Sequence, residues 1–449
     1  MGSEWPLVRL GDVVDLTTGF PFASQQYTDD PTAPRLLRGD NVGQGAIRWD
    51  GAKRWPAPAA EGLDAYWLRE GDVILAMDRP WIEAGLKYAY VRQSDLPALL
   101  VQRVARLRGS DCLDTGFLRY VIAGRGFTDY VTGIQTGTAV PHISSGQIQG
   151  YRFPLPPLAE QRRITGILGA LDDKIDLNRR LSQTLEAMAR ALFKSWFVDF
   201  DPVRAKGAGR DSGLPISLDR LFPASLTESS IGSTPEGWRV SVLNEVLADL
   251  ETGGRPDGGV AGYSAGVPSI GAESIVGLGR FDYSKTKFVP RSFFDRLLKG
   301  RVRDHDVLLY KDGGRPGLFE PHLTLIGDGF PFDECAINEH VYRLRATDEY
   351  GQPLLFFWLT SEFAMEEMRV KGTGVAIPGL NSTQLKSLTT LIPPPPVCQA
   401  FSVLVDPLVS RILACGSQSR TLAEMRALAL PKLVSGERLE ACAPAHAHI

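Results

Sequence analysis

Two short segments rich in threonine and glycine carry the polar chemistry that recurs most clearly along the chain. Thr136, Gly137 and Thr138 are matched in the second half by Thr373 and Gly374. Hydroxyls and accessible backbone N–H groups bind phosphate oxygens, because glycine allows a close approach of the backbone. The segments therefore predict contacts with phosphate groups or, because they repeat, structural loops that pack each domain on a helix.

His142 follows the first of these segments, and Gly379 stands at the matching place in the second. The histidine is either a base or phosphate contact or an ordinary surface residue.

Arginine and lysine supply local positive charge in both halves. Guanidinium groups bind guanine and phosphate, so some of these residues are expected to face DNA, although each alone is equally explained as a solvated surface charge. The principal candidates for DNA binding are Arg38, Arg48, Arg79, Lys311, Arg315 and Lys371. Further charges in the same stretches are Arg35, Lys53, Arg54, Lys87, Arg255, Arg280, Lys285 and Lys287.

Aromatic side chains of the first half have two interpretations. They can stack on bases, as aromatic residues do in single-stranded nucleic-acid sites, or they can pack in the core. The residues concerned are Tyr27, Trp49, Trp55, Trp67 and Trp81.

Patterns that bind nucleotides or metals are missing from the sequence. It contains neither the G-x-x-x-x-G-K-[ST] phosphate loop nor a G-x-G-x-x-G segment opening a helix. The 5 cysteines show no C-x-x-C spacing and the 6 histidines are scattered, so neither a zinc site nor a disulfide framework is indicated. We expect no catalytic residue, no metal and no cofactor on this chain.

A long internal repeat organises these residues. Five matches occur in the same order, with an offset that drifts only between 233 and 238 residues. A repeat of this length is a duplicated domain rather than a solenoid unit. The matches pair residues 5–10 with 238–243, 72–75 with 306–309, 106–108 with 343–345, 136–143 with 373–380 and 156–157 with 394–395.

Each copy consists of short apolar runs broken by turn residues, then prolines, then a helical pattern. Arg106 and Arg108 in the first copy alternate with apolar residues, and Arg343 and Arg345 do so in the second. This alternation predicts half-exposed strands. We predict an α+β fold with two strand-rich domains separated by two long antiparallel coiled-coil helices in a pseudo-two-fold arrangement. The expected segments are a first domain at 1–157, a central helix at 158–199, an ordered but irregular connector at 200–235, a second domain at 236–396, and a C-terminal helix and tail at 397–440.

Apolar residues of the central helix recur at alternating intervals of four and three, which predicts a coiled-coil stripe about 60 Å long. Asn178 occupies a stripe position, where it either sets the register or is exposed. Pro407 predicts that the second helix is kinked or starts late. Outward-facing residues for a partner protein are Leu181, Met188 and Phe193.

The composition and net charge limit the possible functions of the chain. The chain has 449 residues, 43% hydrophobic and 22% charged, with a formal net charge of −3. A DNA-binding face must therefore be local, and tight binding by the chain alone is disfavoured. No apolar run is expected to reach the length of a membrane span, and a cytoplasmic protein is expected.

Four segments resemble a known family, the specificity subunits of type I restriction–modification enzymes. They are residues 153–164 (FPLPPLAEQRRI), 185–203 (LEAMARALFKSWFVDFDPV), 235–238 (PEGW) and 429–437 (ALPKLVSGE). One departure is that Cys398 stands where the first copy has Glu160.

The resemblance implies a non-catalytic protein whose two domains each recognise one half of a split double-stranded DNA site. It implies that the helices set the gap and bind two modification subunits, and that restriction subunits join the complex. S-adenosylmethionine, ATP and Mg²⁺ are then expected on those partners alone. Two alternatives stay open, a self-contained DNA methyltransferase and a scaffold that binds only protein.

Overall fold

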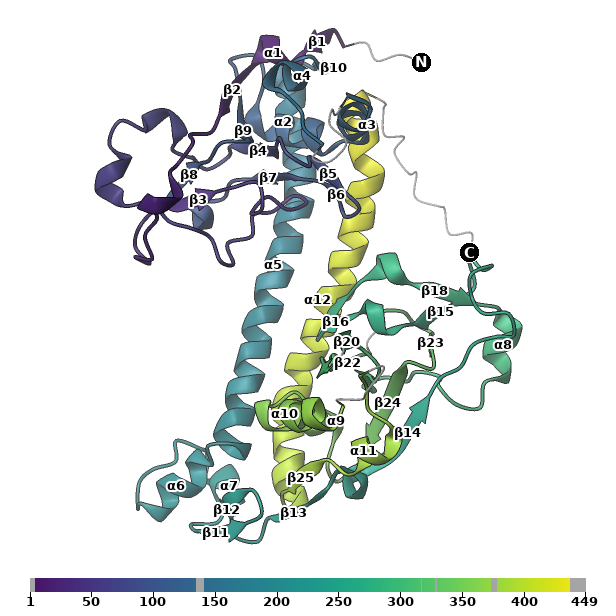
Figure 1. Cartoon of the computed structure of the whole chain (residues 1–449). Helices are drawn as coiled ribbons and strands as arrows, with labels where there is room; N and C mark the ends of the chain where they lie inside the picture. The colour runs from purple at the N-terminus through teal and green to yellow at the C-terminus, as the bar shows by residue number, and fades with distance from the viewer. Residues whose placement is uncertain (1–4, 135–140, 316, 328, 373–377, 437–449) are drawn as a thin grey trace, which may run out of the picture. The chain divides into compact units, whose positions relative to one another are not determined.

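The computed structural model describes residues 5–134, 141–315, 317–327, 329–372 and 378–436. They form two compact units (Figure 1). Unit 1 comprises Met1–Asp173 and Leu422–Ile449, and unit 2 comprises Lys174–Thr421. Two long helices, α5 (Leu158–Phe197) and α12 (Pro395–Ser435), contribute residues to both units.

Unit 1 is built on a four-stranded antiparallel sheet of order β2-β9-β4-β7, and β3 pairs with β8 in parallel. β4 lies inside this sheet because all four of its residues are apolar and buried. The strands are β1 (Leu7–Arg9), β2 (Val14–Thr18), β3 (Arg35–Leu37), β4 (Val73–Ala76), β5 (Trp81–Ile82), β6 (Gly85–Leu86), β7 (Tyr88–Tyr90), β8 (Ala98–Leu100), β9 (Val104–Gly109) and β10 (Arg152–Pro154). The shorter helices are α1 (Leu10–Val13), α2 (Thr115–Ala123), α3 (Arg125–Ile134) and α4 (Ser145–Gln149).

Unit 2 repeats this plan in the order β14-β24-β19-β22, with β15 parallel to β23. Its strands are β11 (Leu226–Ser229), β12 (Gly232–Pro235), β13 (Arg239–Val242), β14 (Leu247–Thr252), β15 (Val267–Ile270), β16 (Ile275–Gly277), β17 (Arg280–Phe281), β18 (Lys287–Val289), β19 (Val307–Tyr310), β20 (Gly314–Arg315), β21 (Leu318–Phe319), β22 (Leu323–Leu325), β23 (Ala336–Ile337), β24 (Val341–Ala346) and β25 (Thr389–Ile392). Its shorter helices are α6 (Asp201–Gly207), α7 (Ile216–Asp219), α8 (Arg291–Arg296), α9 (Gln352–Leu359), α10 (Glu362–Lys371) and α11 (Ser382–Lys386).

The repeat extends to individual hydrogen bonds. α4 starts with a capping box formed by Ser144 and Gln147, and α11 starts with the same box formed by Asn381 and Gln384. Each glutamine amide also donates to the carbonyl of the last residue of the preceding helix, at 2.8 Å in both copies. The predicted duplication and α+β fold are confirmed.

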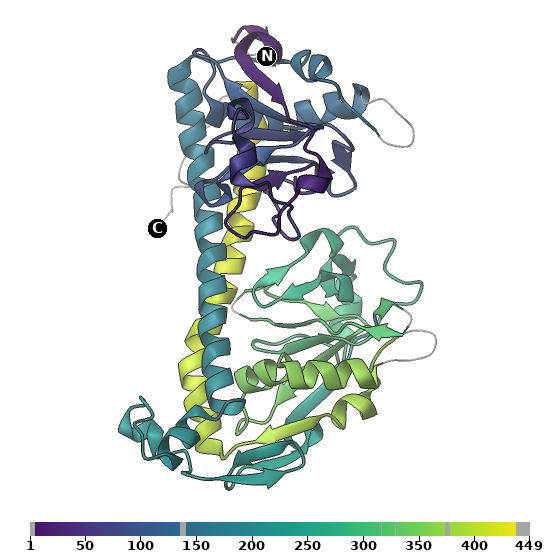
Figure 2. The ribbon, with the colours of Figure 1, turned by 60° about the vertical axis from the view of Figure 1, so that its left-hand side comes forward.

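α5 and α12 pair antiparallel within each unit and lie side by side in both ribbon views (Figures 1 and 2). In unit 1, Arg426 of α12 forms an ion pair with Asp172 of α5 at 2.6 Å. In unit 2, the Asn178 amide donates to the Gln418 side chain at 2.9 Å. Asn178 is buried, so the exposed alternative is wrong and the amide sits in the helix interface, where a polar group favours one register.

Pro407 does not delay α12, which begins at Pro395. Pro395 itself is compatible with the first turn of the helix, because the N–H that a proline lacks would have no helical acceptor there. The carbonyl of Val403, which lacks the N–H of Pro407 as a donor, belongs to a residue that is 73% exposed, so water can satisfy it.

One of the described helices, α12, is long and apolar enough to cross a membrane by length and composition, contrary to the sequence expectation. Its apolar residues Val397, Phe401, Val405 and Val409 lie in the core of unit 2 with no exposed surface. Burial against protein accounts for their hydrophobicity.

The connector after α5 is not irregular, as the sequence suggested. It contains α6, α7 and the β11–β12 hairpin. Phe222 of this segment is buried and meets Trp196 edge to face, with ring centroids 5.0 Å apart. Large apolar side chains among the glycines and prolines therefore anchor the connector to the end of α5.

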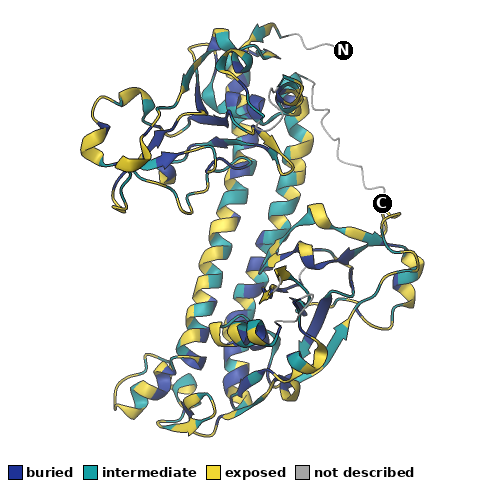
Figure 3. Ribbon diagram, in the orientation of Figure 1, coloured by how far each residue is buried: buried dark blue, intermediate teal, exposed yellow. Residues whose placement is uncertain are grey.

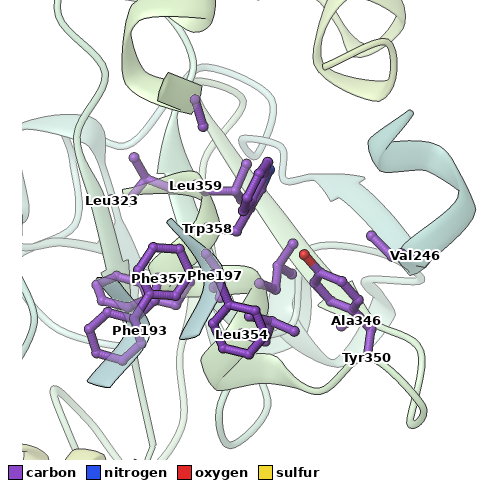
Figure 4. Close-up of a cluster of buried hydrophobic side chains, with 14 of the residues drawn as sticks. Phe193, Phe197, Val246, Leu323, Ala346, Tyr350, Leu354, Phe357, Trp358 and Leu359 are labelled. Atoms are coloured by element: carbon purple, nitrogen blue, oxygen red, sulfur yellow. The ribbon is translucent and has the colours of Figure 1, made fainter. Parts of the chain in front are cut away.

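The largest core cluster lies in unit 2, where α5, α9 and α12 meet the sheet. Figure 4 shows Phe193, Phe197, Phe357 and Trp358 gathered in this cluster. The burial colours of Figure 3 follow the same pattern, with dark strands inside each unit and exposed loops around them.

Candidate DNA interface

We call five cations the unit 1 basic cluster: Arg38, Arg48 and Lys53, which lie between β3 and β4, and Arg79 and Lys87, which lie between β4 and β7. The first three line a hollow of about 250 Å³, together with Asn41 and the carboxylates of Asp40 and Asp50. Arg38 pairs with Asp40 at 3.5 Å, where both side chains are well exposed. Exposed pairs of this kind are weak, so the guanidinium remains available to another anion.

Lys87 is close enough to residues of this hollow and of the loop that follows β4 for their charges to affect it. Burial lowers the pKa of Lys87, and the nearby charges of Arg79 and Arg48 lower it further, whereas Asp40 and Asp78 act in the opposite direction. Cations that disfavour one another's charge gain when an anion enters. The cluster is therefore suited to a polyanion such as the DNA backbone.

Asp78 holds this loop in place. Its carboxylate lies 2.6 Å from Nδ1 of His142 and accepts two hydrogen bonds from Arg103, each at 3.1 Å. The backbone N–H of Arg79 donates to the carbonyl of Pro141 at 2.6 Å. His142 thus has a positioning contact inside unit 1, and its ring is 36% exposed.

Unit 2 has an equivalent loop after β19. Asp312 lies 3.0 Å from Nδ1 of His340 and 2.6 Å from the ammonium of Lys311. The N–H of Gly313 donates to the carbonyl of Pro378 at 2.9 Å, as Arg79 does to Pro141. Repeat alignment pairs Asp78 with Asp312, a signal that the sequence contained and that our list of candidates missed.

The predicted cations of unit 2 have different environments. Lys311 is bound by Asp312 and lies over the Tyr342 ring at 5.7 Å. Lys371 donates to Ser387 at 2.8 Å and pairs with Glu367 at 2.9 Å. The structure uses both lysines within unit 2. Arg315 is exposed on β20 and forms no ion pair with another described residue.

The threonine–glycine segments cannot be placed. Thr136, Gly137, Thr138, Thr373 and Gly374 lie outside the described residues.

Most of the aromatic candidates pack inside unit 1. Trp55 is buried beside Phe22, and the Trp49 indole donates to Asp95 at 2.7 Å. Tyr27 and Trp67 pack against the same cluster as Trp55. Trp81 differs, since 40% of it is exposed.

Two of the four arginines of β9 and β24 are more buried than their alternating pattern suggested, whereas Arg108 and Arg345 are partly exposed, as predicted. Arg106 is 4% exposed and Arg343 is 1% exposed. Arg106 pairs with Asp15 at 2.6 Å, and Arg343 with Asp306 at 3.2 Å. Burial raises the pKa of Asp306. The hydrogen bond from the Arg303 N–H and the charges of Arg343 and Arg345 act in the opposite direction, but burial has the larger effect. Paired charges allow arginine to occupy the interior, which no periodicity reveals.

The predicted partner-binding residues divide into two groups. Met188 is 53% exposed on α5, and Leu181 is half-buried. Phe193 is 5% exposed and contacts Phe357, Trp358 and Phe401, so its assignment as an outward residue is wrong. The aromatic residues of α9 come from a distant part of the chain and cover this face of α5.

The turn at the start of each long helix also differs from the sequence alignment. The buried Gln161 amide donates to the carbonyls of Pro156 and Cys112. At the corresponding turn of α12 the buried residue is Cys398. Its N–H donates to the carbonyl of Pro394, just as the N–H of Gln161 donates to the carbonyl of Pro157. Cys398 therefore replaces Gln161, and comparison with Glu160 was wrong by one residue.

Across the described ranges, no three His, Cys, Asp or Glu side chains gather in a way that could hold a metal ion. The cations instead surround loops at the sheet ends, which suits them to binding an anion rather than to bond making.

Comparisons with known proteins agree with this architecture. A family model described as "Type I restriction modification DNA specificity domain" matches residues 2–187. The type I restriction enzyme MjaIX specificity subunit of Methanocaldococcus jannaschii is 24% identical over 356 residues, which are 78% of this chain and 74% of that protein. The EcoAI specificity subunit of Escherichia coli is 33% identical over 185 residues, 40% of this chain and 30% of that protein.

A solved structure supports the fold alone. It is the S subunit of a type I restriction–modification system from M. genitalium, with a TM-score of 0.58, 13% identity and 96% of each chain covered. The duplicated domains and the paired long helices thus occur in a chain whose residues 2–187 match the type I restriction modification DNA specificity domain, and which is similar in sequence to type I restriction enzyme specificity subunits.

Proposed function

We propose that units 1 and 2 each bind one half of a split double-stranded DNA site, while α5 and α12 bind two modification subunits and set the gap between the halves. The duplicated sheet carries this proposal. β2-β9-β4-β7 and β14-β24-β19-β22 have the same strand order but different loop residues. Two similar domains with different surface loops are suited to two different short sequences.

The proposal assigns no chemistry to this chain. Adenine methylation with S-adenosylmethionine would be carried out by the modification subunits. ATP and Mg²⁺ would act on restriction subunits of the same cytoplasmic complex. The unit 1 basic cluster would bind phosphates and orient the duplex, a role that requires charge and position rather than an activated nucleophile.

Charge suggests that the complex, rather than the subunit alone, binds DNA tightly. Asp40 and Asp50 line the same hollow as Arg38 and Arg48, and the chain carries a net charge of −3. Carboxylates beside the cations reduce the attraction for phosphate. We expect binding to tighten strongly when modification subunits add their own surface.

An exposed apolar line on α5 supports binding of a protein partner. Leu177 and Met188 are 50% and 53% exposed, and Leu181 lies between them. The spacing of four and seven residues places the three on one side of the helix. Apolar surface that is left in water on a helix of this kind marks a protein interface.

The gap-setting role follows from helix length. Seven residues inserted after Arg179 in α5, with seven inserted before Gln418 in α12, keep the coiled-coil repeat and add about 10 Å. That length corresponds to about three base pairs at 3.4 Å each. The preferred gap should lengthen accordingly, and an unchanged gap would contradict this role.

The decisive experiment is methylome sequencing of cells that express this chain with its modification subunit. We expect one interrupted motif, with adenine methylated in both halves. Two unrelated continuous motifs, or no motif, would refute the proposal. Binding of S-adenosylmethionine by the isolated chain would favour the self-contained methyltransferase, and absence of sequence-specific DNA protection by the complex would favour the scaffold.

A further inference from the structure

Each unit carries a short hairpin at the same place in its fold. In unit 1, β5 and β6 follow the central strand β4 (Figure 1), and in unit 2, β20 and β21 follow β19. Trp81 pairs with Leu86 in the first hairpin, and Gly314 pairs with Phe319 in the second. This register makes Ile82 the equivalent of Arg315.

The bases of the two hairpins are anchored alike. Asp78 and Asp312, which precede them, are both held by a histidine and by a second cation. Each hairpin also turns one apolar side chain inward, Leu86 at 5% exposure and Phe319 at 0%. These contacts hold the base of each hairpin against its own unit.

The outer residues of the hairpins are exposed and differ between the copies. Trp81 and Ile82 are 40% and 38% exposed, and Leu318 is 45% exposed beside the exposed Arg315. Exposing a tryptophan and an isoleucine side by side leaves apolar surface in water without benefit to folding. Two domains that recognise different sequences require hairpins that are held in the same way but carry different exposed side chains.

The surrounding charge identifies the occupant. Arg79 precedes the first hairpin with only Pro80 between them, and Lys87 directly follows the hairpin, where its N–H donates to the carbonyl of Pro80 at 2.7 Å. The second hairpin carries Arg315 itself. Cations beside exposed apolar groups suit the major groove, which admits a two-stranded ribbon and offers phosphates, base acceptors and thymine methyl groups.

We propose that the β5–β6 and β20–β21 hairpins enter the major groove of the two half-sites and determine their sequences. Trp81 and Ile82 contact apolar base edges such as the thymine methyl in one half. Arg315 donates to guanine in the other, with Leu318 beside it. This inference rests on the proposed function, because it assigns the recognition of each half-site to one short element.

The test uses the full complex of this chain with its modification subunits. Methylation rates are measured on duplexes that carry the wild-type motif and on duplexes with every single base change in either half. Trp81→Ala, Ile82→Ala and Arg315→Ala are compared with the wild type. Leu7→Ala and Leu298→Ala are matched controls, since these leucines are exposed in units 1 and 2 and lie outside the hairpins.

We expect Ile82→Ala and Trp81→Ala to reduce discrimination about 10- to 100-fold at one or two positions of one half-site, the range of a good base contact. Arg315→Ala should do the same in the other half only, and the controls should change nothing. Base preferences that stay unchanged in all three variants would overturn the inference. A uniform loss of methylation with the same preferences would overturn it too, because it would indicate phosphate or structural contacts.

Failure of the proposed function is a separate result. It appears in the wild-type complex as the absence of any interrupted motif, before a variant is made. Thermal unfolding and binding to the modification subunits confirm that each variant is folded, which is expected because the substituted side chains are exposed.

Discussion

Substituting Phe193 by alanine tests the division of α5 into a face that packs inside unit 2 and a face that we propose binds a partner. Phe193 is 5% exposed, and its ring lies 5.5 Å from that of Phe197 and 6.2 Å from that of Phe357. Met188, on the same helix, is 53% exposed. The two residues are close in sequence and were given the same role by their periodicity, so they form a matched pair.

The structure sets the size of the two effects. Removing a buried phenylalanine side chain costs about 3–5 kcal/mol. Phe193 belongs in the middle or upper part of that range, because aromatic pairs add about 0.5–1.5 kcal/mol beyond buried area. Met188→Ala should cost under about 1 kcal/mol, since roughly half of the side chain is in water and no cavity forms.

Denaturation in guanidinium chloride, followed by tryptophan fluorescence, measures the first effect, because Trp196, Trp238 and Trp358 lie in the core cluster with Phe193. Phe193→Ala should shift the transition of unit 2 to lower denaturant. Met188→Ala should leave the transition in place and weaken binding of the modification subunit in titration calorimetry. A stable Phe193→Ala variant that has lost partner binding would refute this assignment of the two faces.

Two further predictions concern buried groups. Asp172 is 6% exposed and accepts hydrogen bonds from Arg119, Tyr120 and Arg426, so Asp172→Ala should destabilise unit 1 by about 2–3 kcal/mol in a urea titration. This cost is less than that of breaking a fully buried ion pair, because Arg426 is 41% exposed. An unchanged unfolding midpoint would contradict the prediction. Burial raises the pKa of Cys335 to about 12, so at pH 8 this thiol should resist maleimide in the native protein, whereas the exposed Cys112 should react. Peptide mapping by mass spectrometry distinguishes the two thiols. Equal labelling of both would contradict the prediction and show that the native core opens readily.

Local pattern was sufficient for the long elements. The repeat, the proline boundary and the apolar spacing predicted a helix from residue 158, and α5 begins at Leu158. The same spacing placed Asn178 on the stripe, but not its partner, because Gln418 is 240 positions away. Periodicity reports which side of a helix is apolar and carries no information on what covers it.

Candidate site residues were harder to assign. Residue type proposed Arg79, Lys311, Arg315 and Lys371 together as candidates for DNA binding. The structure distinguishes them, since Lys311 and Lys371 are bound by carboxylates of their own unit, whereas Arg79 lies just before one exposed hairpin and Arg315 is part of the other. Whether a cation is free depends on where carboxylates fold to, and that is a property of tertiary contacts.

By itself, the sequence determined the duplication, the α+β architecture and the two long helices, because these depend on short-range spacing and on matches between the halves. Only the tertiary structure decided that Phe193 is core, that Arg106 and Arg343 are buried in ion pairs, and that Ile82 and Arg315 occupy equivalent hairpin positions. The reason is physical: burial and pairing are set by segments that are distant along the chain, and their free energy is absent from any local pattern.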